Sequence, residues 1–286
     1  RAKVVLVGDP CQLPEIEAGG AFSGLRQRLD ASLLATNRRQ QSSWERTALA
    51  HLRVGDTDVA VDAYLDHGRV KIGSPGSDAR EQMVDDWYNA RRSGTAVLLA
   101  PTRAESDALN QRARTRLRAD GEISADRVTL AGAGFAEGDV VVSLRNDRRL
   151  GVLNGTRSVI EHIDLDRQVI RCRTDDHNIV SLPFSYATEG HLAHGYAMTV
   201  HKAQGATYDH CLVLGDDQFT NEAAYTAMSR GRIDNTLYLD GGTSREDAHV
   251  AEVTSDIVDE VRSSLQRSAA QTMAIEHEPR AEADND

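Results

Sequence analysis

The sequence of 286 residues predicts an α/β fold, in which a mostly parallel sheet carries a small inserted antiparallel barrel. Two observations lead to this prediction. Short β-branched runs alternate with helix-length segments through most of the chain, which is typical of a parallel sheet. Between residues 135 and 183 the alternation gives way to short strands separated by turn residues, which is typical of a small barrel.

The first half of the chain supplies the first strands and helices in order. A buried strand is expected at residues 3–7 and a second one at residues 95–100. Capping boxes predict that helices begin after Ser42, with Glu45, and after Thr102, with Glu105. A strand over residues 3–7 would place the polar residues that follow it at the carboxyl edge of its sheet, where α/β folds bind ligands.

The second half begins with the predicted barrel. Its strands are expected at residues 140–144, 158–163, 169–172 and 179–182, with Asn154 and Gly155 in a hairpin turn. After the barrel, periodicity predicts a helix over residues 192–204. The remaining elements are a strand at 210–214, a helix at 221–230, a strand at 236–240, a surface helix at 254–273 and a disordered acidic end.

Charge and cysteine content exclude several classes of protein. The net charge is −11, but residues 251–286 hold nine acids and three arginines, so they carry −6 and the other residues −5. Residues 91–118 hold seven arginines and two acids, which predicts a local basic face. The three cysteines form no CxxC pair, so we expect no disulfide framework and a cytoplasmic, reducing location. No apolar run is long enough for membrane insertion.

Two segments of the first half carry candidate phosphate-binding groups. In GDPCQLP, residues 8–14, Gln12 could orient a water or sense a phosphate oxygen, although the segment also fits a plain strand-to-turn connection. In TNRRQ, residues 36–40, two arginines could grip a polyphosphate, or could form a solvated basic turn.

Two further segments lie in the second half. In YAMTVHKAQGAT, residues 196–207, four polar side chains lie close together before a glycine, which favours a functional site. His201 has no second ligand at metal-binding spacing, so no metal site is expected there. YTAMSRGR, residues 225–232, places Arg230 at the tip of a helix. Arg230 could be an arginine finger, or could simply complement the helix dipole.

In their order and spacing, the four segments closely resemble motifs III, IV, V and VI of superfamily 1 DNA helicases of the RecD-like branch. The last two are most similar to the C-terminal helicase region of MobF conjugative relaxases. The resemblance covers residues 3–242 and implies a second RecA-like, P-loop NTPase-type motor lobe with an inserted SH3-like barrel. By this resemblance, the end of a first lobe lies at residues 1–31. The second lobe lies at residues 32–134 and 188–243, on either side of the barrel at residues 135–187. A C-terminal tail follows at residues 244–286.

The resemblance also implies a role for each motif residue. Those expected to sense the γ-phosphate or stabilise its transfer are Gln12, Arg39 and Arg230, with Arg38 the less favoured neighbour of Arg39. Those on the nucleotide side are Gly8, Asp9, Gln204, Gly205 and Thr207. Those facing single-stranded DNA are Thr199, His201, Lys202 and Arg103. Two positions depart from the family pattern, Thr207 where an acid is frequent and Ala203 where a serine is frequent.

The sequence contains no GxxxxGK[ST] segment, and no acidic pair for Mg²⁺ precedes residues 8–14. We therefore expect the chain to be the C-terminal part of a longer ATP-dependent 5′-to-3′ DNA helicase, inactive alone. Its implied cofactors are ATP and Mg²⁺, and its implied partners are single-stranded DNA, the missing N-terminal lobe and conjugation machinery. Two alternatives stay open, namely a stand-alone RecD-like repair helicase and a non-catalytic remnant; upstream coding sequence distinguishes them.

Overall fold

The structure, a computed structural model, describes residues 3–13, 21–29, 31–34, 36–73, 78–216, 219–241 and 250–268. Its centre is a five-stranded sheet in the order β1-β12-β11-β2-β10, and every neighbouring pair is parallel. This confirms the predicted α/β class. The strands are β1 (Val70–Ile72), β2 (Ala96–Ala100), β10 (Ala197–Thr199), β11 (Tyr208–Leu214) and β12 (Gly231–Leu239).

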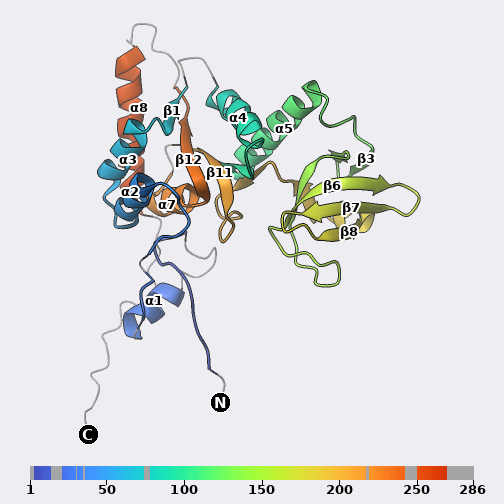
Figure 1. Ribbon diagram of the computed structural model, residues 1–286, viewed down its shortest axis with the longest axis horizontal. Coiled ribbons are helices and arrows are strands. Elements are labelled where there is room, and N and C mark those ends of the chain that lie inside the picture. The colour runs from blue at the N-terminus through green and yellow to red at the C-terminus, as the bar shows by residue number, and fades with distance from the viewer. Residues whose placement is uncertain are drawn as a thin grey trace.

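Helices cover both faces of this sheet (Figure 1). Alternate residues of β2 show the division, since Val97 and Leu99 join one apolar core and Leu98 and Ala100 join the other. The first core is closed by α2 (Ser43–Arg53), α3 (Thr57–Asp66), α7 (Asn221–Met228) and α8 (Val250–Leu265). The second is closed by α4 (Ala79–Ala90) and α5 (Arg103–Ala119).

A separate antiparallel sheet is inserted between α5 and β10, and it lies to the side of the parallel sheet in Figure 1. Its strand order is β8-β7-β6-β5-β9, and it surrounds an apolar core of its own. The strands are β5 (Val140–Ser143), β6 (Arg157–Asp164), β7 (Val169–Thr174), β8 (Ile179–Pro183) and β9 (Leu192–His194). A short hairpin, β3 (Val128–Leu130) with β4 (Ala133–Phe135), precedes it, and α6 (Phe184–Thr188) joins β8 to β9.

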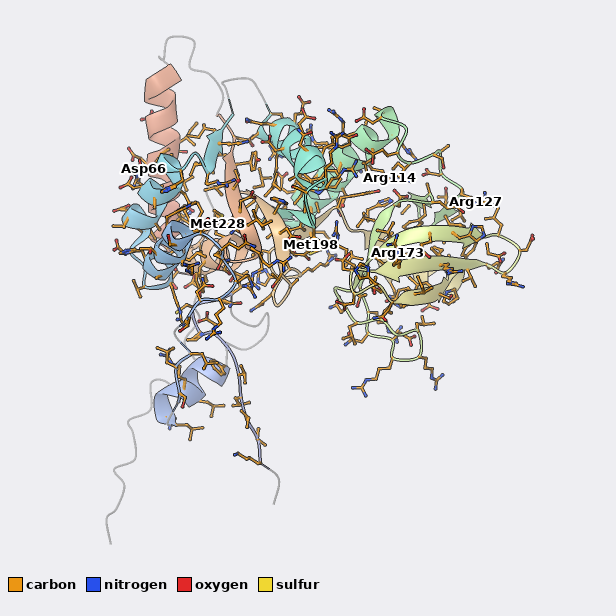
Figure 2. The ribbon with its side chains drawn as sticks, viewed as in Figure 1. Asp66, Arg114, Arg127, Arg173, Met198 and Met228 are labelled. Atoms are coloured by element: carbon orange, nitrogen blue, oxygen red, sulfur yellow. The ribbon has the colours of Figure 1, made fainter. Side chains whose placement is uncertain are left out.

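The inserted sheet is fixed to the motor sheet by a buried ion pair. Arg114 of α5 donates from Nε and Nη2 to the two carboxylate oxygens of Asp139, each at 2.8 Å. Tyr196, just before β10, donates to Asp139 Oδ1 at 2.7 Å. Figure 2 shows Arg114 on α5 facing the insert. Because a buried carboxylate needs such partners, these bonds hold the insert in one orientation.

The prediction of a buried strand at residues 3–7 is wrong. These residues form no strand and are exposed, Val7 by 85%. They run away from the body of the molecule, near α1 (Ala21–Arg28), as Figure 1 shows. A β-branched run becomes a buried strand only where neighbouring strands pair with it, and within the described residues no strand does so. Leu33 and Leu34, just before the TNRRQ segment, are likewise exposed and lie in no strand.

The prediction of a helix over residues 192–204 is also wrong. The segment forms β9, β10 and a series of turns. Strand pairing overrides the helical periodicity, since β9 pairs with β5 and β10 pairs with β2. Gly195 lies between them, where a Cβ would lie 2.9 Å from the carbonyl carbon of Val141, so the chain passes too close to β5 for a side chain.

The expected basic face of residues 91–118 is largely neutralised. Five of its seven arginines form ion pairs, namely Arg91 with Glu122, Arg112 with Asp78, Arg114 with Asp126 and Asp139, Arg116 with Asp85, and Arg118 with Asp126. The paired acids lie outside residues 91–118, so a count of charges within that segment did not include them.

The predicted Thr102 cap is confirmed, whereas the Ser42 capping box and the bounds of the last helix differ from expectation. Thr102 accepts from Glu105 N, but Ser42 makes no side-chain cap and Glu45 is buried. Helix α8 is a surface helix as predicted, because Asp259 is exposed while Val261 and Leu265 pack against the core. The acidic end, residues 269–286, lies outside the described residues. None of the helices in the described part of the chain is long and apolar enough to cross a membrane.

Candidate nucleotide and DNA site

Arg230 occupies the point at which α7 passes into β12. Its side chain is almost fully buried, with 1% of the residue exposed. Nε donates to the carbonyl of Thr226 at 2.7 Å, and Nη2 donates to Ser229 Oγ at 2.8 Å. Arg230 therefore does complement the C-terminal end of α7, as the simpler interpretation expected.

The TNRRQ segment packs directly beside Arg230. Arg39 Nη1 donates to the carbonyl of Ser229 at 2.7 Å. Gln40, which is buried, donates from Nε2 to the carbonyls of Ser229 and Gly231 at 3.1 and 2.8 Å. The two motifs are 190 residues apart in the sequence, and these bonds bring their arginines together.

Neither Arg39 nor Arg230 forms an ion pair with a carboxylate of the described residues. Burial and, to a lesser extent, the positive charge of Arg39 lower the pKa of Arg230 to about 10. Burial also lowers the pKa of Arg39. Two cations held together out of water are unfavourable by themselves, so the site is built to accept an anion.

The GDPCQLP segment docks against the same point through polar side chains. Gln12 Oε1 accepts from Arg230 Nη2 at 3.4 Å. Asp9 accepts from Arg53 Nη2 at 3.1 Å and from Tyr225 OH at 3.0 Å. We call these last three residues the Asp9 clasp; it ties the segment to the end of α2 and to α7.

Main-chain bonds of Leu13 complete this docking. Leu13 N donates to Thr226 Oγ1 at 2.8 Å, and the carbonyl of Leu13 accepts from Gln204 Nε2 at 3.3 Å. Gln204 therefore joins the site from the loop of residues 200–207. The expected position at a carboxyl edge is wrong, because the site lies at the amino ends of β11 and β12, where Tyr208 N bonds the carbonyl of Arg230 at 3.0 Å.

Gly8, Gly205 and Thr207 lie nearby but are exposed, and in the described part of the chain they make no hydrogen bond to the arginines. Gly205 has a φ of +87°, so glycine is needed there for the turn itself. The expected nucleotide-side residues thus divide into Asp9 and Gln204, which join the arginine site, and these three, which do not.

The four residues expected to face DNA lie at the opposite edge of the sheet. Thr199 is the last residue of β10, and Arg103 begins α5 directly after β2. His201 is exposed and Lys202 is half-buried. Burial and the positive charge of Arg103 lower the pKa of Lys202, so these two cations are neighbours.

The insert reaches this basic group through its hairpin turn. A Cβ built on Gly155 would lie 3.7 Å from the carbonyl oxygen of Lys202. Gly155 has a φ of +90°, as expected for the predicted Asn154–Gly155 turn. The loop of residues 200–207 therefore runs from the basic group beside the insert to the arginine site.

The acidic groups near the arginine site are already engaged or isolated. Both carboxylate oxygens of Asp9 are engaged by the clasp. Within the described residues, no three His, Cys, Asp or Glu side chains lie close enough together to hold a metal ion. The described chain can supply cations to a polyphosphate.

Four residues of the site were not expected from the sequence: Gln40, Glu45, Arg53 and Asn235. Gln40 directly follows Arg39, so its motif was a signal. Glu45 was expected to cap a helix; it instead accepts from Asn235 Nδ2 at 2.8 Å. Arg53 lies 44 residues from its partner Asp9, and no local pattern marks such a pair.

Comparison with known proteins identifies relatives of this chain. A family model described as an AAA domain matches residues 1–75. The probable conjugal transfer protein TraA of Sinorhizobium fredii is 36% identical over 243 residues, which cover 83% of this chain and 22% of that protein. The ATP-dependent RecD2 DNA helicase of Deinococcus radiodurans is 31% identical over 242 residues, covering 81% and 32%. The chain is related to superfamily 1 DNA helicases and to TraA conjugal transfer proteins.

The relationship predicted from the four motifs is thereby confirmed. The chain spans about a fifth of the length of this conjugal relative and about a third of the RecD2 helicase. Among solved structures, the crystal structure of Pif1 helicase from Bacteroides in complex with ADP-AlF3 and ssDNA has a TM-score of 0.50 and 16% identity. The match covers 86% of this chain and 64% of that one, and it shows a shared helicase motor fold.

Proposed function

We propose that the chain is the C-terminal part of an ATP-dependent 5′-to-3′ DNA helicase of a conjugative relaxase-helicase. It supplies the γ-phosphate sensor Gln12, the arginine finger Arg230 and contacts to single-stranded DNA. The observation that carries the proposal is the convergence of Arg39 and Arg230, two buried or half-buried cations without a described carboxylate, next to Gln12.

A nucleotide triphosphate supplies the charge that this site lacks. Arg39 and Arg230 present guanidinium groups that can bind phosphate oxygens bidentately. The bond between Gln12 and Arg230 has a donor–acceptor distance of 3.4 Å, so it is weak and a phosphate oxygen can replace it. Arg230 would then stabilise charge that develops as the γ-phosphoryl group is transferred, which is the role of an arginine finger.

Hydrolysis also needs a P-loop and Mg²⁺ ligands, which this sequence does not contain. We propose that a first RecA-like lobe of the same longer protein supplies them. The lengths of the relatives support this, since the chain matches only part of each. The position of residues 8–13 against α7 would place Gln12 between the two lobes.

The basic group at the opposite edge is proposed to contact single-stranded DNA. Arg103, His201 and Lys202 can reach phosphates, and the inserted sheet, proposed to be SH3-like, flanks them through Gly155. If about three phosphates are neutralised, log K for a single strand falls against log salt with a slope near −2, at about −0.7 per phosphate. Lys202→Ala should make that slope shallower by about 0.7.

Turnover in a protein that contains both lobes tests the proposal. Arg230→Ala should lower DNA-stimulated ATP hydrolysis by about 10³ to 10⁵, and lysine should not rescue it, because a point charge lacks the planar fork. The matched control is Arg232→Ala, which removes an exposed arginine two residues away that pairs with Asp209. Near-normal turnover in Arg230→Ala would contradict the proposal and favour a non-catalytic remnant.

A stand-alone RecD-like repair helicase is the second candidate, because the RecD2 helicase aligns over almost the same share of the chain. Both candidates use the same arginine site. They differ in the sequence that precedes it, since a cluster of metal-binding histidines with a catalytic tyrosine would indicate a relaxase.

A further inference from the structure

Glu45 is a buried acid beneath the arginine site, and the expected functions leave it without a role. It lies on α2 and is 1% exposed. Oε1 accepts from Asn235 Nδ2 at 2.8 Å and from Tyr64 OH at 3.4 Å. Oε2 is buried, and no hydrogen-bond partner for it is found among the described residues. A carboxylate with one unpartnered oxygen in the core is costly when ionised, so the neutral acid is favoured.

Asn235 connects this acid to the arginine segment. Its Oδ1 accepts from Gly231 N at 2.7 Å, and its Nδ2 also lies 3.3 Å from the carbonyl of Gly231. Gly231 directly follows Arg230. A Cβ on Gly231 would lie 2.1 Å from the carbonyl oxygen of Asp234, so the main chain is tightly enclosed here. A change at Glu45 therefore reaches Arg230 through one side chain and one peptide unit.

We propose that Glu45 is a proton-sensitive positioning residue for the arginine site. In its protonated form it holds Asn235, which fixes Gly231 and the guanidinium of Arg230. When it ionises, Oε1 stays the acceptor of Asn235 Nδ2, but Oε2 carries buried charge with no donor among the described residues. Water or a shift of α2 must then relieve this charge, and Asn235 and Gly231 move with Glu45. The consequence for nucleotide binding rests on the proposed function, but the coupling from Glu45 to Gly231 does not.

Charged and titratable groups face Glu45 from four neighbouring segments. They are Tyr64 of α3, Arg69 before β1, Cys211 of β11 and Asp234 of β12. Burial raises the pKa of Glu45 to about 7, while the Asn235 bond and Arg69 oppose the rise. Arg69 does not neutralise Glu45, because it pairs with Asp234 at 3.4 Å.

The test follows the amide of Gly231 by NMR in the chain as it is. Its chemical shift should titrate with a midpoint near pH 7 in the wild type. Its protection from hydrogen exchange should fall about tenfold between pH 6 and pH 8, as a carboxyl whose pKa rises from 4.5 to about 7 requires. Glu45→Gln keeps the shape without the titration, so both effects should vanish. The matched control, Glu81→Gln, changes an exposed acid on α4 and should leave both unchanged.

A separate pH effect must be distinguished, because His210 of β11 bonds Asp234 at 3.0 Å. Glu45→Gln retains His210, so a titration of Gly231 that persists in this variant overturns the proposal. If Glu45→Gln does not fold, the Tyr64→Phe variant tests the proposal instead. It removes a donor to Oε1 and should raise the Gly231 midpoint, and an unmoved midpoint overturns the proposal.

Binding of inorganic tripolyphosphate, measured on the same samples, separates this inference from the proposed function. In the wild type it should weaken more steeply between pH 6 and pH 8 than in Glu45→Gln. If tripolyphosphate binds at no pH while Gly231 still titrates with Glu45, the proposed function fails and the positioning role stands. If it binds with equal pH dependence in both proteins and Gly231 does not titrate, the positioning role fails and the site stands.

Discussion

Two buried arginines of this chain, Arg114 and Arg230, are held in opposite electrostatic environments. Arg114 donates to Asp139 and Asp126, and these acids raise its pKa against the effect of burial. Arg230 is more deeply buried, bonds only neutral groups among the described residues, and has its pKa lowered to about 10. Arg114 finds its counter-charges within the fold and joins the two sheets. Arg230 has no carboxylate partner among the described residues, so it needs an anion from outside the chain.

A substitution at Asp139 tests most directly the difference between the two arginines. Asp139→Asn leaves Arg114 with only the more exposed Asp126, so the free energy of unfolding should fall by about 3 kcal/mol, as for a broken buried ion pair. Arg230→Ala should cost much less, because it also removes the repulsion with Arg39. Chemical denaturation of both variants checks this order. Equal losses would mean that Arg230, like Arg114, is a structural arginine.

A similar effect on stability is expected from pH at Glu45. Its native pKa of about 7 lies above the unfolded value of 4.5, so the native state binds the extra proton between these values. The resulting stability is fully present below pH 4.5 and is lost as the pH rises through 7, by at most about 3 kcal/mol. Denaturation midpoints of wild type and Glu45→Gln at pH 5 and pH 8 measure it. A wild-type curve parallel to that of the glutamine variant would contradict the assignment.

The smallest effects are expected at the Asp9 clasp, on the arginine side of the comparison. Tyr225→Phe removes one hydrogen bond to Asp9 and should cost about 1 kcal/mol or less. Its effect should be local, with faster proteolysis or hydrogen exchange of residues 8–13 and unchanged exchange in β2. A matched loss of protection in β2 would show that Tyr225 supports the core rather than the docking of this segment.

Sequence patterns correctly predicted the features that depend on neighbouring residues or on the order of motifs. The β2 run TAVLLA is apolar on both faces and became a central strand, and the Asn154–Gly155 turn has the positive φ that such a pair favours. Motif order predicted that Gln12, Arg39 and Arg230 belong to one site, and the fold brings them together. These signals lie within a few residues or in a recurring order.

The failures share one physical cause, which is pairing between distant segments. Residues 3–7 have the composition of a strand, but no described neighbour pairs with them. Residues 192–204 have helical periodicity, but β2 and β5 supply strand partners. Glu45 fits a capping box, but it is buried in the core, where Asn235, 190 residues away, donates a hydrogen bond to it. None of these partners can be read from the local sequence.

Binding of inorganic tripolyphosphate to the chain tests most directly the claim that Arg39 and Arg230 form an anion site. Calorimetry should show one site in the wild type that weakens with salt. Arg230→Ala and Arg39→Ala should each weaken binding at least about tenfold, as loss of a charge-assisted bond requires. Arg232→Ala, the control for charge in the same segment, should bind as the wild type does. No binding by the wild type, or equal binding by wild type and Arg230→Ala, would contradict the account.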